Sequence, residues 1–431
     1  MRKYLNGLVI GLLAALLLPM TAGAQGGSGG MLAVIGTDRN LSIYDADGRN
    51  PFPITTDADI QRRIYQMPTW STDGRLAFFG VSLDQADPYS LRMFVVQDVQ
   101  AGATYATAYT SQEEVLTYAY WSPNDCPLGN CRDLALLYTP AGGNLLAVKL
   151  IRDDGGTFSE IEVERGAPFY YSFAPNGKRM LWHRFGLRLE LYDVESNSIE
   201  STLTDVPGAF QAPMWSPVAG DERLLFAVRN ANNPQNSDLV IAEGDSRLTL
   251  LADQPPPLAF AWNADATQVA VTSAFGALKV LDASNGAELA SSQFGQIAAH
   301  FWSPQGDKVA YLSLRRPNLV GQTYLSSNGH GEGSFFQQTQ PQQLTWYVLD
   351  VATGDEFALD SFSPTREMIY FLNFFEQFAR SHTFWSPDGR YLAYAAFDST
   401  RDLAEVRLAE VRNGGALRKV ADGVIGIWSW R

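Results

Sequence analysis

The sequence is poor in the side chains on which catalysis and metal binding usually depend. Its 431 residues include four histidines and two cysteines. Two of the histidines, His300 and His382, precede similar tryptophan motifs. Neither a third histidine nor carboxylates at a suitable spacing support a metal or catalytic site that includes them. A Gly-x-Ser-x-Gly pattern occurs at residues 26–30, but it lies in a Gly/Ser-rich stretch and not at the strand-to-helix turn that a nucleophilic serine requires. We therefore expect no enzyme activity, no cofactor and no bound metal.

Long apolar runs are absent beyond the N-terminus. The apolar run at residues 8–18 is too short to span a membrane comfortably. Two basic residues precede it, and the small residues 22–24 follow it as in a signal-peptide cleavage site. The pattern predicts a signal peptide over residues 1–24 and a flexible leader over 25–30. The protein is then secreted, periplasmic or associated with the cell envelope. A retained N-terminal anchor is the alternative.

Basic residues are fewer than acidic ones. The chain has 32 Lys and Arg against 46 Asp and Glu, which gives a formal net charge of −14. An acidic surface argues against nucleic acid and anionic membranes as partners. We expect a soluble monomer with no membrane span once the signal peptide is removed.

The two cysteines lie close together. Cys126 and Cys131 enclose a loop that contains proline and glycine. In an exported protein such a pair can close a small disulfide, and this is the favoured interpretation. A metal site would need further ligands.

One short motif recurs and organises the chain. Residues 385–389, Trp-Ser-Pro-Asp-Gly, have the chemistry of a tight turn, because proline fixes φ and aspartate and glycine favour the later turn positions. Successive copies are 40 to 52 residues apart, except for one spacing of 83. We expect the aromatic rings of the motif to fill the wedges between neighbouring repeats rather than to form a binding platform. The copies begin at Trp70, Trp121, Phe173, Trp215, Trp262, Trp302, Trp385 and, in truncated form, Trp428.

This period predicts an all-β fold, a single β-propeller of four-stranded blades over residues 31–431. Each motif would form the first strand of a blade. Residues 31–55 have the pattern of second, third and fourth strands, and residues 424–430 that of a first strand without successors. We therefore expect the two ends to share one blade, which closes the ring and hides the sheet edges. Eight blades result, and seven is the alternative if one weak copy is not a blade.

The motif resembles the WD-like repeats of TolB-type β-propellers. The resemblance lies in residues 385–394, Trp-Ser-Pro-Asp-Gly-Arg-Tyr-Leu-Ala-Tyr, and in residues 41–48, Leu-Ser-Ile-Tyr-Asp-Ala-Asp-Gly, and it extends over nearly the whole mature chain. The sequence is also similar to the propeller half of prolyl-oligopeptidase and dipeptidyl-peptidase relatives, although the chain has no room for their hydrolase domain. The resemblance implies the fold and says little about activity.

Function on a propeller usually resides where the repeat is interrupted. Residues 316–343 interrupt the second-to-third connection of the Trp302 blade, and residues 361–382 lead from that blade to the next, with apolar residues at helical spacing. Topology places both insertions on one face, together with the loops 83–89 and 230–237, and we predict that this face binds a ligand. The alternative is that the helix caps the channel mouth or packs on a blade. The candidate ligand-binding residues are His300, Tyr324, His330, Phe335, Phe336, Phe375 and His382.

The favoured interpretation is an exported, non-catalytic scaffold that binds a protein, peptide or glycan on this face. A propeller lyase or hydrolase that uses His300 or His382 with channel carboxylates is the enzymatic alternative. A purely structural component of the envelope is the third. The loop between the cysteines is expected on the opposite face, in a first-to-second turn.

Overall fold

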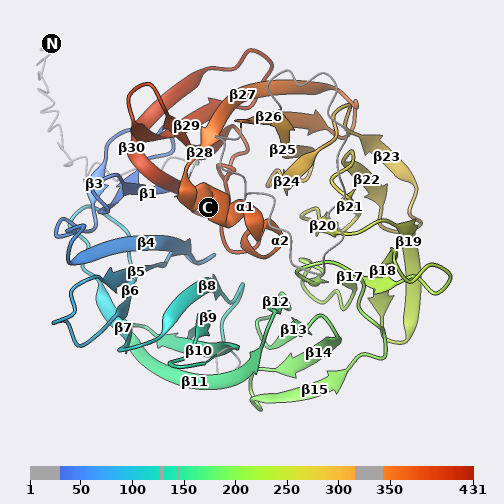
Figure 1. The fold of residues 1–431 in the computed structure, drawn as a ribbon, viewed down its shortest axis with the longest axis horizontal. Coiled ribbons are helices and arrows are strands. Elements are labelled where there is room, and N and C mark those ends of the chain that lie inside the picture. The colour runs from blue at the N-terminus through green and yellow to red at the C-terminus, as the bar shows by residue number, and fades with distance from the viewer. Residues whose placement is uncertain (1–29, 127–130, 144, 316–342) are drawn as a thin grey trace, which may run out of the picture.

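The chain folds into antiparallel sheets that surround a central axis, as Figure 1 shows. The structure is a computed structural model, and it describes residues 30–126, 131–143, 145–315 and 343–431. Two short helices lie at the centre of the ring. The arrangement is that of an all-β propeller, as the repeat predicts.

Five of the sheets have four strands each, and in each the chain runs from the innermost strand to the outermost (Figure 1). The first strand of every one of these sheets ends at a motif aromatic, so the sheet boundaries follow the sequence repeat. The strands are β4 (Arg63–Trp70), β5 (Leu76–Ser82), β6 (Leu91–Val96) and β7 (Ala106–Ser111); β8 (Val115–Trp121), β9 (Arg132–Thr139), β10 (Leu146–Asp154) and β11 (Thr157–Gly166); β12 (Phe169–Phe173), β13 (Arg179–Arg184), β14 (Arg188–Asp193) and β15 (Ser198–Thr202); β16 (Met214–Trp215), β17 (Leu224–Arg229), β18 (Ser237–Glu243) and β19 (Ser246–Gln254); β20 (Leu258–Trp262), β21 (Gln268–Ser273), β22 (Lys279–Asp282) and β23 (Glu288–Ser291).

A ten-stranded sheet joins the C-terminal part of the chain to its N-terminal strands. In spatial order it contains β24 (Ile297–Trp302), β25 (Lys308–Arg315), β26 (Gln343–Asp350), β27 (Glu356–Pro364), β28 (Tyr391–Asp398), β29 (Leu403–Glu410), β30 (Leu417–Trp428), β1 (Leu32–Gly36), β2 (Leu41–Tyr44) and β3 (Phe52–Pro53).

Strand β30 belongs to two neighbouring blades. Its first half pairs with β29, where Leu417 lies opposite Ala409. Its second half pairs with β1, where Trp428 lies opposite Leu32. The sequence pattern indicated two separate strands here, but the backbone crosses from one blade to the next without a turn.

The Trp385 hairpin differs from the expected pair of strands. Trp385 forms only an isolated bridge to Leu392 in β28. In its place, the end of β27 pairs with β28, with Ser363 opposite Phe397. The reason is the helical insertion, which leads the chain away from the sheet edge after residue 364 and returns it only just before the motif.

The motif tryptophans also form hydrogen bonds between blades. Four of them donate the indole Nε1 hydrogen to a backbone carbonyl on the first strand of the preceding blade, at the residue just before that blade's own motif tryptophan. These bonds therefore link the innermost strands around part of the ring. They join Trp70 to Ile427 (3.2 Å), Trp121 to Thr69 (3.0 Å), Trp302 to Ala261 (3.0 Å) and Trp385 to Phe301 (3.1 Å).

The predicted helix is present in two pieces, α1 (Arg366–Asn373) and α2 (Phe375–Phe378). The N-cap of α1 is Thr365, which directly follows the end of β27 at Pro364. The Thr365 hydroxyl accepts a hydrogen bond from the Met368 backbone nitrogen at 3.2 Å and donates one to the Val424 carbonyl at 2.7 Å. The second bond fixes the helix start to the second half of β30.

Successive strands of a blade run in opposite directions, so their connections lie alternately on two faces of the ring. We call loop face the one that carries the second-to-third loops and the connections between blades, and turn face the one that carries the first-to-second and third-to-fourth turns. In the blade of β4, for example, Arg63 at the strand start lies opposite Ser82 at the end of β5, so both mark the loop face.

Candidate functional site

Helices α1 and α2 form a plug at the centre of the ring (Figure 1). Met368, Phe371, Leu372 and Phe378 are buried. The plug is also held by hydrogen bonds to inner strands, in which the Gln377 side-chain amide uses both its oxygen and its nitrogen. Gln377 Oε1 accepts from the Tyr171 backbone nitrogen at 2.9 Å, and its Nε2 donates to the Tyr171 carbonyl at 2.8 Å. Gln377 thus bonds to the backbone of the inner strand β12 and holds the plug to the ring.

His300 and His382 are buried beside the plug, with exposed fractions of 1% and 2%. The His300 ring contacts Phe375, with ring centroids 5.2 Å apart, and neither of its nitrogens has a hydrogen-bond partner among the described residues. His382 shares hydrogen bonds with Thr69 Oγ1 at 3.2 Å and Ser381 Oγ at 2.5 Å. Burial lowers the pKa of both histidines to about 3, so both are neutral near pH 7.

The two histidines pack against different rings. His300 contacts Phe375, whereas the His382 ring lies 4.9 Å from that of Phe371 and 5.3 Å from that of Phe378. Within the described ranges no group of three or more histidine, cysteine or acidic side chains could hold a metal ion. Of the other candidate ligand-binding residues, Phe375 is half-buried in the plug. Tyr324, His330, Phe335 and Phe336 lie outside the residues that the structure describes.

A pocket of about 400 Å³ lies off the central axis, between the plug and the blades of β8 and β12. Its wall combines the beginning of β8, the loop-face ends of β9 and β10, the connection into β12 and one side of the plug. The lining residues are Thr117, Tyr118, Leu137, Leu146, Ala167, Pro168, Phe169, Tyr170, Tyr370, Phe374, Gln377 and Phe378.

Polar groups of this wall are used within the protein. The Tyr370 hydroxyl donates to the Thr117 carbonyl at 2.7 Å, and the Tyr118 hydroxyl donates to the Gln377 carbonyl at 2.9 Å. The Gln377 side chain is occupied by the backbone of Tyr171. The wall therefore offers aromatic and aliphatic surface to an occupant and no charged side chain.

Two charged residues of the plug were missed by the sequence analysis. Glu376 is buried, and burial raises the pKa of its carboxyl to about 8. The backbone N–H groups of Gln211 and Ala212 and the charge of Arg380 act in the opposite direction but do not outweigh burial. Burial also lowers the pKa of Arg380 to about 10. Glu376 Oε2 and Arg380 Nη2 have no hydrogen-bond partner in the described part of the chain. The available signal was a glutamate and an arginine four residues apart in an otherwise apolar segment.

Exposed apolar side chains gather on the loop face. The described residues include fourteen exposed large apolar side chains, and ten of them lie at loop-face ends of strands or in loop-face connections. The other four, Ile199, Leu248, Leu289 and Leu417, lie on fourth strands at the outside of the ring. The ten on the loop face are Ile60, Leu83, Val115, Leu145, Phe185, Leu187, Val206, Phe294, Phe397 and Leu403.

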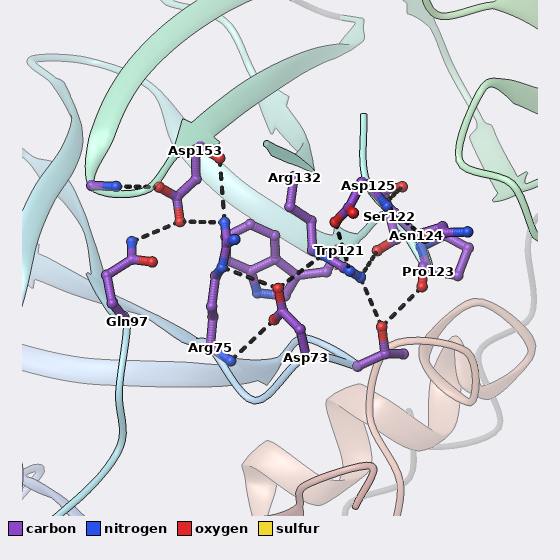
Figure 2. A network of polar contacts seen from close by, with 12 residues as sticks. Asp73, Arg75, Gln97, Trp121, Ser122, Pro123, Asn124, Asp125, Arg132 and Asp153 are labelled. Atoms are coloured by element: carbon purple, nitrogen blue, oxygen red, sulfur yellow. Dashed lines mark hydrogen bonds and ion pairs between the residues drawn. The ribbon is translucent and has the colours of Figure 1, made fainter. Parts of the chain in front are cut away.

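The turn face instead carries ion pairs that join blades, as Figure 2 shows for the blades of β4 and β8. Asp73 lies 3.1 Å from both Arg75 and Arg132, and the fully buried carboxylate of Asp153 accepts from Arg75 at 2.9 Å and from Gln97 at 2.7 Å. Burial raises the pKa of Asp73, but hydrogen bonding and the charges of Arg132 and Arg75 outweigh it and hold this pKa below its usual value. Such internally satisfied charges are structural contacts.

The predicted disulfide is present in the same region. Cys126 and Cys131 are bonded, with their Cα atoms 5.3 Å apart, in the first-to-second turn between β8 and β9. The Cys126 backbone nitrogen donates to the Cys131 carbonyl at 2.7 Å. Next to the bridge, Arg132 pairs with Asp125 at 3.2 Å (Figure 2). The disulfide therefore supports the turn that carries the ion pairs.

Comparisons with known proteins find similarity of fold and none of sequence family. No known protein family and no curated protein matches the sequence. The chain is similar to the crystal structure of a eukaryotic initiation factor, with a TM-score of 0.52 and 10% identity over 93% of this chain and 98% of that one. At this identity the likeness concerns the fold alone.

Two further solved structures are similar at lower scores. Dipeptidyl peptidase 4 of Porphyromonas gingivalis has a TM-score of 0.45 and 10% identity over 64% of this chain and 48% of that one. TolB of Acinetobacter baumannii has a TM-score of 0.36 and 13% identity over 91% and 77%. These scores are too low to support an inference about function. Among the helices of the described residues, none has the length and apolar character needed to cross a membrane.

Proposed function

We propose that this protein is an exported, non-catalytic binding scaffold whose eight blades form a closed ring and whose loop face binds another polypeptide. Ring closure is supported by the pairing of β30 with β1, and by the Trp70 bond to Ile427 across the same seam. Export is supported by the signal-like N-terminal sequence and by the disulfide.

The distribution of exposed apolar side chains carries the proposal for the loop face. Scattered exposed apolar residues are ordinary, but their concentration on one face marks an interaction surface. Ten of the fourteen in the described chain lie on the loop face, and the aromatic pocket lies at the same end of the blades. The turn face, by contrast, uses its charges in contacts between blades.

The non-catalytic part of the proposal is supported by the chemistry of the two histidines. A general base must reach its substrate and be able to exchange a proton near the working pH. His300 and His382 are almost completely buried, and their pKa of about 3 places their titration far below neutrality. The double variant His300→Ala and His382→Ala, assayed in a hydrolase and lyase screen, tests this part. A turnover that disappears in the variant while its fold is retained would establish the enzyme instead.

Site-specific photo-crosslinking tests the binding face. A photoreactive phenylalanine analogue is placed at Leu403 or Phe294 on the loop face, and at Leu289 or Leu248 on the outer strands, as matched exposed positions. We expect crosslinked polypeptide adducts in envelope extract from the loop-face positions and a background level from the outer strands. Adducts that form equally at all four positions, or at the outer strands alone, would refute the proposed face.

A further inference from the structure

Two titratable side chains of the plug, Glu376 and Arg380, have no part in the proposed binding function. Glu376 is 6% exposed, and its Oε2 has no hydrogen-bond partner among the described residues. Arg380 Nε donates to the Glu376 backbone carbonyl at 3.3 Å, while its buried Nη2 has no partner in the same part of the chain. The atoms Oε2 and Nη2 are therefore not bonded to each other. A buried carboxylate without such a partner is costly, so the carboxyl retains its proton.

The Glu376 carboxyl is seated on the segment that precedes β16. Backbone N–H groups of Gln211 and Ala212 bond to it. The Gln211 side chain also donates to the Asn373 carbonyl at the end of α1, at 3.0 Å. Residues 207–213 contain no charged side chain. This seat therefore suits a neutral carboxyl better than a carboxylate.

The elements packed around α2 carry titratable groups that are uncharged near neutral pH. Helix α2 packs against α1, β12, β20 and β24, and the Phe378 ring lies 4.9 Å from that of Tyr118 on β8. Burial raises the pKa of the tyrosines among these groups and lowers that of the histidines. They are Tyr118 and Tyr120 on β8, Tyr171 on β12, His183 on β13, His300 on β24, Tyr370 on α1 and His382 after α2.

Charged groups on the same elements are few. On α1, Glu367 pairs with Arg39 at 2.6 Å, and Arg366 is exposed. Strand β20 has no titratable side chain, and Tyr170 of β12 lies against His183 with ring centroids 6.2 Å apart. Arg380 is therefore the one charged side chain of the described chain that shifts the pKa of Glu376, and it lowers it.

The plug has no part in the contacts that close the ring. The chain leaves the sheet at Pro364 and rejoins the inner strands at the bridge between Thr383 and Trp428. The pairing of β30 with β1 and the hydrogen bonds of the motif tryptophans involve no residue of α1 or α2. We therefore expect residues 365–382 to open with less free energy than the sheets need to unfold.

Opening of the plug is linked to the proton on Glu376. In the closed plug the pKa of this carboxyl is about 8, whereas in water it returns to its ordinary value of about 4.5. The closed state binds the proton more tightly, so its stability is fully present below about pH 4.5 and is lost as the pH rises through 8. Within this interval the opening equilibrium increases about tenfold per pH unit.

We infer that the plug is a proton-controlled latch: the protonated Glu376 carboxyl seats α2 on the segment before β16, and loss of the proton favours release of residues 365–382 from the ring. Release removes one wall of the aromatic pocket and uncovers inner strands around the axis (Figure 1). It needs no partner on the loop face, so it stands apart from the proposed binding function.

Hydrogen exchange of the full chain between pH 6 and pH 9.5 tests the latch. Opening constants are obtained for amides of residues 365–382 and of β5 to β7, after correction for the intrinsic exchange rate at each pH. We expect the plug amides to open more readily than the sheet amides, and their opening constant to rise roughly 50-fold from pH 6 to pH 8. Glu376→Gln cannot ionise, and we expect a change of less than about twofold over the same interval. Glu113→Gln makes the same substitution at an exposed position and is the matched control.

A second variant tests the electrostatic origin of the effect. The charge of Arg380 lowers the pKa of Glu376, so Arg380→Gln should raise it. The plateau that the wild-type opening constant reaches above pH 8 should then begin at a higher pH. A plateau that stays in place or moves to lower pH would show that the carboxyl does not respond to this charge, and it would overturn the latch.

Three further results would overturn it. Plug and sheet amides with equal opening constants at every pH would show that the plug unfolds only with the ring. Plug opening that is independent of pH would show that no proton is involved. A pH dependence that Glu376→Gln retains, or that Glu113→Gln removes equally, would show that the proton is not on Glu376.

Discussion

The indole nitrogen of Trp70 donates a hydrogen bond to the carbonyl oxygen of Ile427 at 3.2 Å, across 357 positions of sequence. The same relation joins Trp121 to Thr69 and Trp385 to Phe301, where the acceptor again precedes a motif tryptophan. The blade that contains the chain end is therefore tied to its neighbour by the same contact that ties blades within the chain. A repeat tryptophan contributes both apolar burial and one directed bond.

Trp70→Phe is expected to destabilise the protein more than Trp262→Phe does. Both rings are buried, but the Trp70 nitrogen donates to Ile427, whereas the Trp262 nitrogen has no hydrogen-bond partner among the described residues. Loss of the Trp70 donor removes this hydrogen bond, which costs about 0.5–1.5 kcal/mol beyond the change in ring size. Urea unfolding of the two variants measures the difference. Equal losses would show that the bond contributes nothing beyond packing.

Glu376→Gln is expected to stabilise the protein at alkaline pH and to have little effect in acid. The folded-state pKa of about 8 is above the ordinary value of a glutamate, so the folded state binds the proton more tightly than the unfolded state. The stability that Glu376 contributes is fully present below about pH 4.5 and is lost as the pH rises through 8. The glutamine remains neutral throughout, so its advantage grows to a few kcal/mol over this interval.

Thermal unfolding at several pH values checks this prediction. The matched control is Glu113→Gln, which makes the same substitution at an exposed position. An advantage of Glu376→Gln that stays constant from acid to alkaline pH would show that the carboxyl is ionised in the folded protein.

His300→Leu is expected to reduce the loss of stability in acid. Burial lowers the pKa of His300 to about 3, so between the ordinary histidine value of about 6.5 and 3 the unfolded state binds a proton that the folded state does not. Stability is therefore retained above about pH 6.5 and falls as the pH is lowered toward 3. Leucine has a similar volume and does not titrate. The difference in melting temperature between variant and wild type should shift in favour of the variant on acidification, and a difference independent of pH would contradict the assignment.

Replacing both Cys126 and Cys131 by serine is expected to cost about 2 kcal/mol, because the closed loop is short and restricts the unfolded chain only modestly. The loss should be local, since the Arg132 contacts with Asp73 and Asp125 adjoin the loop. Hydrogen exchange should increase in the turn between β8 and β9 and remain unchanged in β20 to β23. A general increase around the ring would show that the bridge supports the whole fold.

The sequence predicted the parts of this protein that depend on local and periodic signals. The copies of the motif, except the one at Trp385, located the first strands. The proline and glycine turns located the hairpins, and Cys126 and Cys131 indicated their own bond. The helical spacing of Met368, Phe371 and Phe378 predicted a helix, although its cap is Thr365 because that side chain also bonds to Val424. These features can be recognised in the sequence because turn chemistry and helical spacing involve neighbouring residues and because the motif recurs at a regular interval.

Only the tertiary structure decided what the helical insertion does and where a ligand fits. His300, His382 and Phe375 were among the candidate ligand-binding residues, but the fold buries the two histidines and places the pocket beside Tyr370 and Phe374. Burial depends on which side chains of distant blades meet, and no local pattern records that. The sequence alone thus determined the repeat and the order of most of its strands, while the exposure of side chains on the loop face was decided by contacts among segments up to several hundred residues apart.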